Sequence, residues 1–142
     1  MSLLSDLYIS SPESALSYDT TRSLPRSERA EFNGLTFEEF SRLWAILKQD
    51  QWTSEHSNEF ECILEVDGGQ RLIHRFPTSF VIALSRLDDK QTLEAAGMWV
   101  KTGDLAYMSC PPDAILPVIS AASRLAKAAQ EGNKSMYLWM CA

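Results

Sequence analysis

Histidine, cysteine and long apolar runs are scarce in this sequence of 142 residues, and each scarcity excludes a kind of site. The two histidines and three cysteines form no Cys-x-x-Cys or His-x-x-x-His pattern, and no Asp-x-Asp-x-Asp-Gly run occurs, so we predict no metal site. No apolar run approaches the roughly 18 residues of a membrane-spanning helix, and the first residues lack the features of a signal peptide. Three cysteines without paired spacing are typical of free thiols in a reducing compartment, which predicts a cytoplasmic protein.

Glycine-rich phosphate-binding loops and the Gly-x-Ser-x-Gly motif are missing as well. The sequence therefore predicts no cofactor and offers no catalytic motif. A net charge of −6 opposes binding to nucleic acid or to an anionic membrane, because both are negatively charged themselves.

Negative charge is concentrated in the N-terminal half of the chain. Residues 1–70 hold 13 acidic and 5 basic residues, whereas residues 71–142 hold 6 acidic and 8 basic residues. The stretch from Gln49 to Gln70 contains six carboxylates and neither Lys nor Arg. Such a stretch is either a solvated face that keeps the protein soluble or a docking surface for a basic partner.

The length and the 45% hydrophobic share predict a single domain, residues 1–142, of the α+β class. Apolar positions at 6–10 and 135–141 predict an N-terminal and a C-terminal strand that lie side by side, and 59–76 reads as a central hairpin. We expect these strands to form a small antiparallel sheet packed with about four helices. Residues 11–34 show no period and are rich in Ser, Thr and Pro, which predicts a long surface loop.

The first helix has the clearest local signal. Thr36 and Glu39 have the spacing of a capping box, in which each side chain accepts from the other residue's backbone N–H, and an apolar stripe continues to about Asp50. Similar periodicity predicts helices over 77–88, 89–102 and 113–131, with 105–112 as a connecting loop. In the helix over 89–102, Leu93 and Trp99 are expected on the buried face.

The hairpin's register follows from its turn, Asp67-Gly68-Gly69. A three-residue loop places opposite one another those residues whose numbers sum to 136, so Glu65 faces Arg71 and Glu61 faces Arg75 on one side of the hairpin. Apolar residues then share the other side, which a slip of one residue would destroy.

The same register sets Cys62 opposite His74 on the apolar side, where a thiol and an imidazole could act together in catalysis. Packing in the core is the favoured interpretation, because an uncharged thiol suits an apolar setting. Cys110, just before two prolines, is either an exposed reactive thiol or an inert loop cysteine. Glu61 and Glu65 resemble a catalytic carboxylate pair, yet cross-strand ion pairs explain them better.

Seven residues are the candidates for binding a partner. Trp52 and Tyr107 are the aromatics that no core stripe explains, and large aromatics beside charge are common at interface centres, although Trp52 also fits a simple cap over the first helix. With the nearby carboxylates they complete the predicted partner-binding set, which is Asp50, Trp52, Glu55, Glu59, Glu61, Asp67 and Tyr107.

In its size, its acidity and its lack of catalytic motifs, the chain resembles the small acidic immunity proteins with which bacteria neutralise toxins, many of them basic nucleases. The resemblance is one of general character and involves no shared motif. It implies a non-enzymatic protein that blocks a basic toxin by occlusion, its carboxylates meeting the toxin's Lys and Arg. The alternatives are an accessory or dimeric scaffold subunit, and a cysteine-dependent enzyme that uses Cys62 or Cys110.

Overall fold

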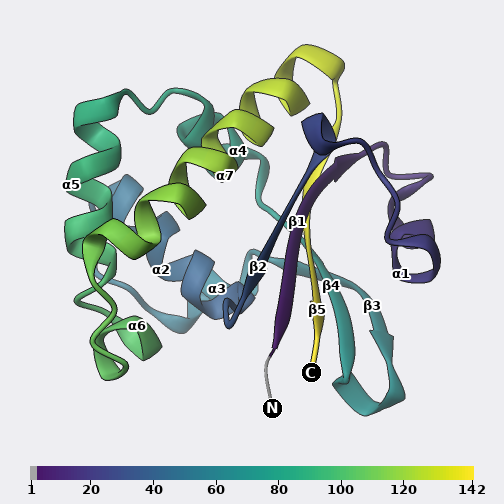
Figure 1. Ribbon diagram of the computed structural model, residues 1–142, viewed down its shortest axis with the longest axis horizontal. Coiled ribbons are helices and arrows are strands. Elements are labelled where there is room, and N and C mark those ends of the chain that lie inside the picture. The colour runs from purple at the N-terminus through teal and green to yellow at the C-terminus, as the bar shows by residue number, and fades with distance from the viewer. Residues whose placement is uncertain (1–2) are drawn as a thin grey trace.

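A five-stranded antiparallel sheet forms the centre of the fold (Figure 1). The computed structural model describes residues 3–142. In spatial order the strands are β2 (Arg29–Asn33), β1 (Leu4–Ser10), β5 (Ser135–Cys141), β4 (Arg71–Arg75) and β3 (Glu61–Val66). The α+β class and the three predicted sources of strands, the N-terminal segment, the central hairpin and the C-terminal segment, are confirmed.

The predicted pairing of the first and last strands is confirmed. Leu7 lies opposite Leu138 and Tyr8 opposite Tyr137 in the antiparallel register of β1 and β5. β5 also pairs with β4, so it is the central strand of the sheet. A strand covered on both faces reads as a continuous apolar run, which explains why residues 136–140 are all buried and almost all apolar.

Helices cover one face of the sheet (Figure 1). Four of them have eight or more residues and match the four predicted: α2 (Phe37–Lys48), α4 (Thr78–Ser85), α5 (Asp89–Trp99) and α7 (Pro112–Gly132). Three short helices were not predicted: α3 (Ser54–Asn58), α6 (Gly103–Tyr107) and, on the other face of the sheet, α1 (Tyr18–Thr21). The prediction of a loop over 105–112 is therefore wrong at its start. No helix within residues 3–142 is long and apolar enough to cross a membrane.

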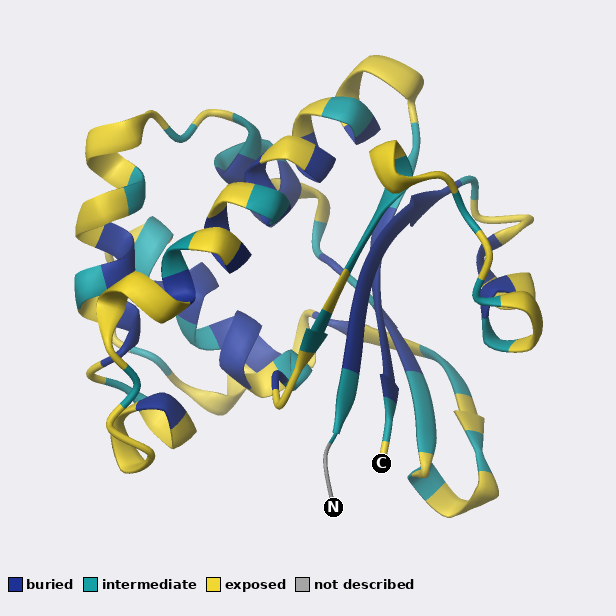
Figure 2. Cartoon of the chain, viewed as in Figure 1, coloured by how far each residue is buried: buried dark blue, intermediate teal, exposed yellow. Residues whose placement is uncertain are grey.

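Alternation along the strands divides the buried side chains between two cores. Leu7 and Leu138 point to the helical face and join the larger core, while Tyr8 and Tyr137 point to the opposite face. Figure 2 shows the buried residues on the sheet and on the inward sides of the helices.

The second face of the sheet is covered by residues 11–28, which we call the strap. The prediction of a long surface loop over 11–34 is wrong at Arg29–Asn33, which forms the edge strand β2. Residues 11–28 contain only short helical turns, and within them Tyr18 is buried against Tyr8, with ring centroids 4.2 Å apart. The sequence signal was weak, since β2 contributes only Ala30 and Phe32 as apolar positions.

The hairpin has a bulge that the predicted register lacks. Glu61 lies opposite Arg75 and Cys62 opposite His74 as predicted, but beyond Ile63 the register shifts, so that Glu65 faces Leu72. Both Ile63 and Leu64 then pack on the face of the sheet that carries Tyr8 and Tyr137, which we call the aromatic face. A bulge of this kind adds one residue to an edge strand and increases its twist. The predicted pair of Glu65 with Arg71 is therefore wrong.

Only half of the predicted capping box forms at the start of α2. The Thr36 side chain accepts from the N–H of Glu39, at 3.3 Å, as predicted. The Glu39 carboxylate instead turns inward and accepts from the N–H of Asp104 at the start of α6, at 3.1 Å. This carboxylate thus holds α6 against α2.

Candidate partner-binding site

The six carboxylates between Gln49 and Gln70 are all exposed. They follow a path from the end of α2, across α3 and along the edge strand β3 to the tip of the hairpin. They are Asp50, Glu55, Glu59, Glu61, Glu65 and Asp67.

Three of these carboxylates have polar partners within the chain. Asp50 lies 3.6 Å from Nζ of Lys48 and 3.3 Å from Nε2 of His56. Asp67 pairs with Arg71 at 3.1 Å, and Glu59 accepts from the indole N–H of Trp44 at 3.2 Å. These contacts reduce the negative charge at both ends of the path but leave each side chain open to solvent.

The other three, Glu55, Glu61 and Glu65, form no ion pair within 4.0 Å among residues 3–142. Glu61 faces Arg75 in the register without reaching it. Because of the bulge, Glu61 lies on the aromatic side of the sheet and Glu65 on the helical side. The carboxylates therefore border an edge and do not form one flat patch.

Trp52 packs over the side of α2. Its indole N–H donates to Oγ of Ser41 at 2.9 Å, and the guanidinium carbon of Arg42 lies 3.9 Å from its ring centroid. α6 reaches the same arginine, because a Cβ placed on Gly103 would lie 2.7 Å from Nε of Arg42. The structure thus brings Trp52 close to the short helix that carries Tyr107, a side chain that is 90% exposed.

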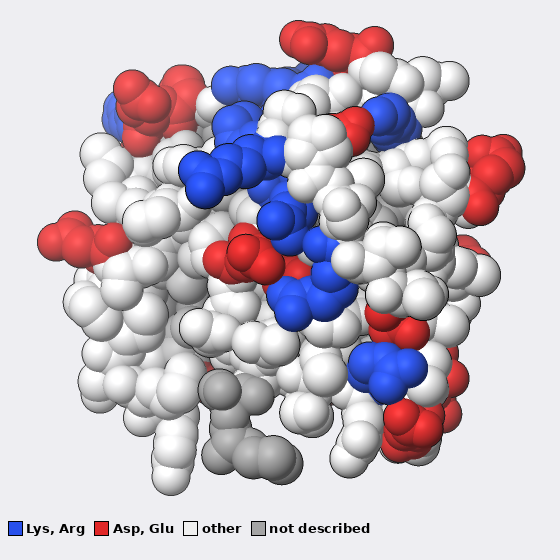
Figure 3. Space-filling view, turned by 45° about the vertical axis from the view of Figure 1, so that its right-hand side comes forward, with Lys and Arg blue, Asp and Glu red and all other residues white. Residues whose placement is uncertain are grey.

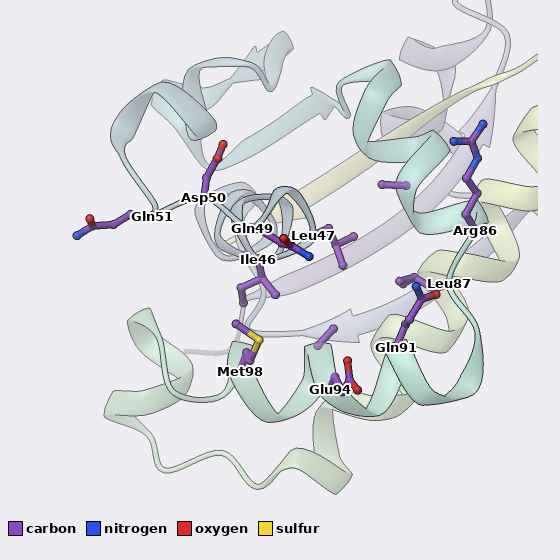
Figure 4. Close-up of a pocket in the computed structure, with 12 residues that line it drawn as sticks. Ile46, Leu47, Gln49, Asp50, Gln51, Arg86, Leu87, Gln91, Glu94 and Met98 are labelled. Carbon is purple, nitrogen blue, oxygen red and sulfur yellow. The ribbon is translucent and has the colours of Figure 1, made fainter.

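A groove of about 710 Å³ runs between α2, α4 and α5 (Figure 4). Its floor consists of aliphatic and methionine side chains that complete the inner faces of these helices: Ile46, Leu47, Ala83, Leu87, Ala95 and Met98. Sequence reasoning assigned two of them, Leu47 and Leu87, to buried helix faces and could not show that a groove opens here.

Polar residues form the rim of this groove, and every one of them is exposed: Gln49, Asp50, Gln51, Arg86, Gln91 and Glu94. In Figure 4, Asp50 and Met98 lie towards one end, Glu94 lies on the α5 wall, and Arg86 stands at the other end. The groove therefore begins at the first carboxylate of the acidic path.

Exposed apolar side chains are concentrated in α5 and α6. Within residues 3–142, four of the five large apolar side chains that are exposed belong to α5, α6 or the residue after α6: Leu93, Met98, Tyr107 and Met108. Leu93 was expected in the core but is 58% exposed, because it lies on the outer side of α5.

The pairing of Cys62 with His74 is present in the register but not in a form suited to catalysis. His74 is buried and stacks on Phe37 with ring centroids 3.9 Å apart, whereas Cys62 is exposed, contrary to the expectation that both lie inside. Burial lowers the pKa of His74 to about 4, so the ring is neutral near pH 7 and cannot stabilise a thiolate as an imidazolium.

Cys110 is half-buried, and its thiol lies 3.6 Å from the carbonyl oxygen of Pro111. No imidazole or carboxylate accepts a hydrogen bond from it among the described residues. Within residues 3–142, no three His, Cys, Asp or Glu side chains are grouped so that they could hold a metal ion.

Cations lie around the strap and β2, at the other edge of the sheet from β3, and Figure 3 shows Lys and Arg side chains grouped on one face of the molecule. Arg22 donates through Nε and Nη2 to Oδ2 of the buried Asp6, at 3.0 and 2.8 Å, and the hydroxyl of Tyr18 donates to the same oxygen at 2.8 Å. Lys134 pairs with Glu28 at 2.8 Å. The only sign of this network in the sequence is a single carboxylate, Asp6, inside an apolar strand, and it was not predicted.

Comparisons with protein-family models, with curated proteins and with solved structures found no match to this chain.

Proposed function

We propose that this chain is a non-enzymatic binding protein that meets a basic protein partner along its acidic path from Asp50 to Asp67. One observation carries the proposal: the path contains six exposed carboxylates and no Lys or Arg, and four of the six, Glu55, Glu59, Glu61 and Glu65, have no ionic partner among the described residues. Charge of one sign along an edge attracts an oppositely charged partner over distance and raises the association rate.

The finer proposal is that the partner is a basic toxin and that the chain is its immunity protein, acting in the bacterial cytoplasm. Occlusion requires no catalytic residue, only a surface that covers the partner's cationic site. Trp52 and Tyr107 support this reading, because aromatic side chains near a charged rim often supply the centre of an interface. Three free cysteines support a reducing compartment.

The test is to capture partners from cells that make this chain and to measure their binding kinetics. The variant Glu61→Lys with Glu65→Lys reverses two unpaired carboxylates. Its control, Glu13→Lys with Glu131→Lys, makes the same change of net charge at exposed carboxylates outside the path. We expect a basic partner whose association rate falls about tenfold or more with the first variant and far less with the control.

An added arm tests the toxin proposal. The partner, expressed alone, should inhibit growth, and one equivalent of this chain should restore it. An acidic partner, or one that binds both variants equally well, would contradict the proposed function.

A dimeric scaffold is the second candidate, favoured by the exposed apolar side chains of α5 and α6. Sedimentation at high protein concentration separates the two candidates. A dimer that Leu93→Lys returns to monomer supports the scaffold, and a monomer at every concentration removes it.

A further inference from the structure

We infer that the groove between α2 and α5 binds an amphipathic, basic helix of the partner. This inference rests on the proposed function and deepens it, because it names the part of the partner that is recognised and the place where that part docks.

The floor of the groove suits the apolar stripe of a helix. Helices that dock in grooves insert side chains at i, i+3, i+4 and i+7, and an elongated channel between two helices accepts such a row. Met98, which is 53% exposed, lies at one end of the floor. Its unbranched thioether can adjust to the incoming side chains, as methionine does in other helix-binding grooves.

A small molecule fits the groove less well than a protein segment. Small-molecule sites enclose most of the ligand and place a few buried polar groups on apolar walls. Here all six polar lining residues are exposed, so none is held in a fixed position by burial. Solvated groups of this kind are typical of the rim around a protein interface.

The charges on the rim indicate the sign and the direction of the bound helix. Asp50 at one end and Glu94 on the α5 wall offer carboxylates, whereas Arg86 at the far end offers a cation. Both contacts of Asp50 with Lys48 and His56 use Oδ2, which leaves Oδ1 for an incoming Lys or Arg. The partner's cations should therefore lie near Asp50 and Glu94, with a neutral or acidic residue near Arg86.

A second copy of this chain is a poor occupant. Each copy carries a net charge of −6, so two acidic surfaces would repel each other. The long helices α2 and α7 already bury their apolar faces in the larger core. We therefore expect the groove to bind a helix from a different protein.

The test is a selection of random 20-residue peptides, displayed on yeast, for binding to the full chain. We expect the recovered peptides to place apolar residues at helical spacing and to carry an excess of Lys and Arg. Met98→Glu should weaken their binding about tenfold or more. Met108→Glu, the matched control, replaces a methionine that is similarly exposed, 59% against 53%, but lies outside the groove, and it should change binding less than twofold.

Charge variants test the predicted direction. The double variant Asp50→Lys with Glu94→Lys should weaken peptide binding about tenfold. Arg86→Glu should leave the affinity for the peptides unchanged or raise it. Circular dichroism and thermal unfolding of each variant establish that it is folded.

Four results would overturn the inference: no recovered peptide depends on Met98, the peptides respond equally to Met108→Glu, they are acidic, or the groove takes up only small apolar compounds. Failure of the groove is distinguishable from failure of the proposed function. A natural partner that responds to Glu61→Lys with Glu65→Lys but not to Met98→Glu would retain the function and refute the groove. A partner that responds to Met98→Glu but not to Glu61→Lys with Glu65→Lys would support the groove and contradict binding along the acidic path.

Discussion

Single buried side chains make the stability of this protein depend on pH, and His74 is the clearest case. Its pKa in the folded protein is about 4, below the ordinary value of 6.5, because burial disfavours the charged ring. A folded-state pKa below the unfolded one gives stability that is present above pH 6.5 and is lost as the pH falls towards 4. Between pH 7 and pH 4 this should cost the wild type roughly 2–3 kcal/mol.

The variant His74→Phe keeps a ring against Phe37 but cannot titrate. In urea unfolding followed by tryptophan fluorescence, we expect its stability to fall less than that of the wild type between pH 7 and pH 4. His56→Gln serves as the control, because it removes the other histidine and leaves His74 in place. Parallel pH curves for His74→Phe and the wild type would show that His74 contributes nothing to this dependence.

Glu39 should produce the opposite dependence. Burial raises the pKa of this carboxyl above its ordinary value of 4.5, and Oε2 has no hydrogen-bond partner among the described residues. Because the folded-state pKa is the higher one, stability associated with Glu39 is present at low pH and is lost as the pH rises through that pKa.

Glu39→Gln keeps an oxygen that can accept from the N–H of Asp104 and abolishes the titration. We expect its stability relative to the wild type to rise between pH 4 and pH 7, measured by denaturant unfolding at each pH. Glu38→Gln, at the exposed neighbouring position, should show no such trend. A relative stability of Glu39→Gln that falls over this range would contradict the assignment.

Among the elements, the strap depends most on a few polar contacts. Asp19 accepts from the indole N–H of Trp139 at 2.8 Å and from Nε of Arg71 at 2.9 Å, so it ties α1 to the sheet. The hydrogen bond from Arg71 lowers the pKa of Asp19, so its contribution is present near neutral pH and declines in strong acid.

Asp19→Ala removes these contacts and leaves the indole N–H of Trp139 without its acceptor. We expect a loss of about 2 kcal/mol in unfolding free energy and faster trypsin cleavage after Arg22 or Arg26. Asp67→Asn is the matched control, since it removes the other carboxylate on Arg71 at an exposed position whose φ of 54° Asn tolerates, and it should cost less than about 0.5 kcal/mol. Equal proteolysis of the two variants would show that Asp19 does not hold the strap.

Elements with strong periodicity could be predicted from the sequence, and those fixed by tertiary contacts could not. The stripe of α2 and the apolar run of β5 each specify a buried element locally. By contrast, β2 has two apolar residues, and α6 is held in place through Glu39, a residue 65 positions from its partner Asp104. The bulge at Ile63 was hidden because the unshifted register pairs Glu61 with Arg75 and Glu65 with Arg71, so the sequence gives no reason to expect a shift.

The candidate site also has one part that could be predicted from the sequence and one part that could not. A stretch without Lys or Arg is visible in the sequence, so Asp50 and its neighbouring carboxylates could be named. The groove could not, because it results from the relative positions of α2, α4 and α5, whose apolar lining residues individually resemble core residues. Sequence reasoning also paired Glu65 with Arg71 and so concealed one of the unpaired carboxylates.

At the scale of the whole molecule, the sheet joins the first and last described segments. Leu4 lies opposite Cys141 in the register of β1 and β5, so a short turn could link them (Figure 1). The hairpin tip at Gly68 is exposed, and opening the backbone there breaks no hydrogen bond between β3 and β4. The chain should therefore tolerate circular permutation, which succeeds at exposed loop tips when the two ends are close.

A permutant that joins residue 142 to residue 3 through about three Gly and Asn residues, and opens the chain between Gly68 and Gly69, keeps all five strands in their spatial order. We expect one cooperative urea transition with nearly the same dependence on denaturant as the parent, because both bury the same surface. Opening the same circle between Leu125 and Ala126, both buried in α7, should prevent cooperative folding. Two separate transitions in the first permutant would contradict the single domain. If one transition is seen, the groove and the acidic path belong to the same cooperative unit, so a ligand at either one stabilises both.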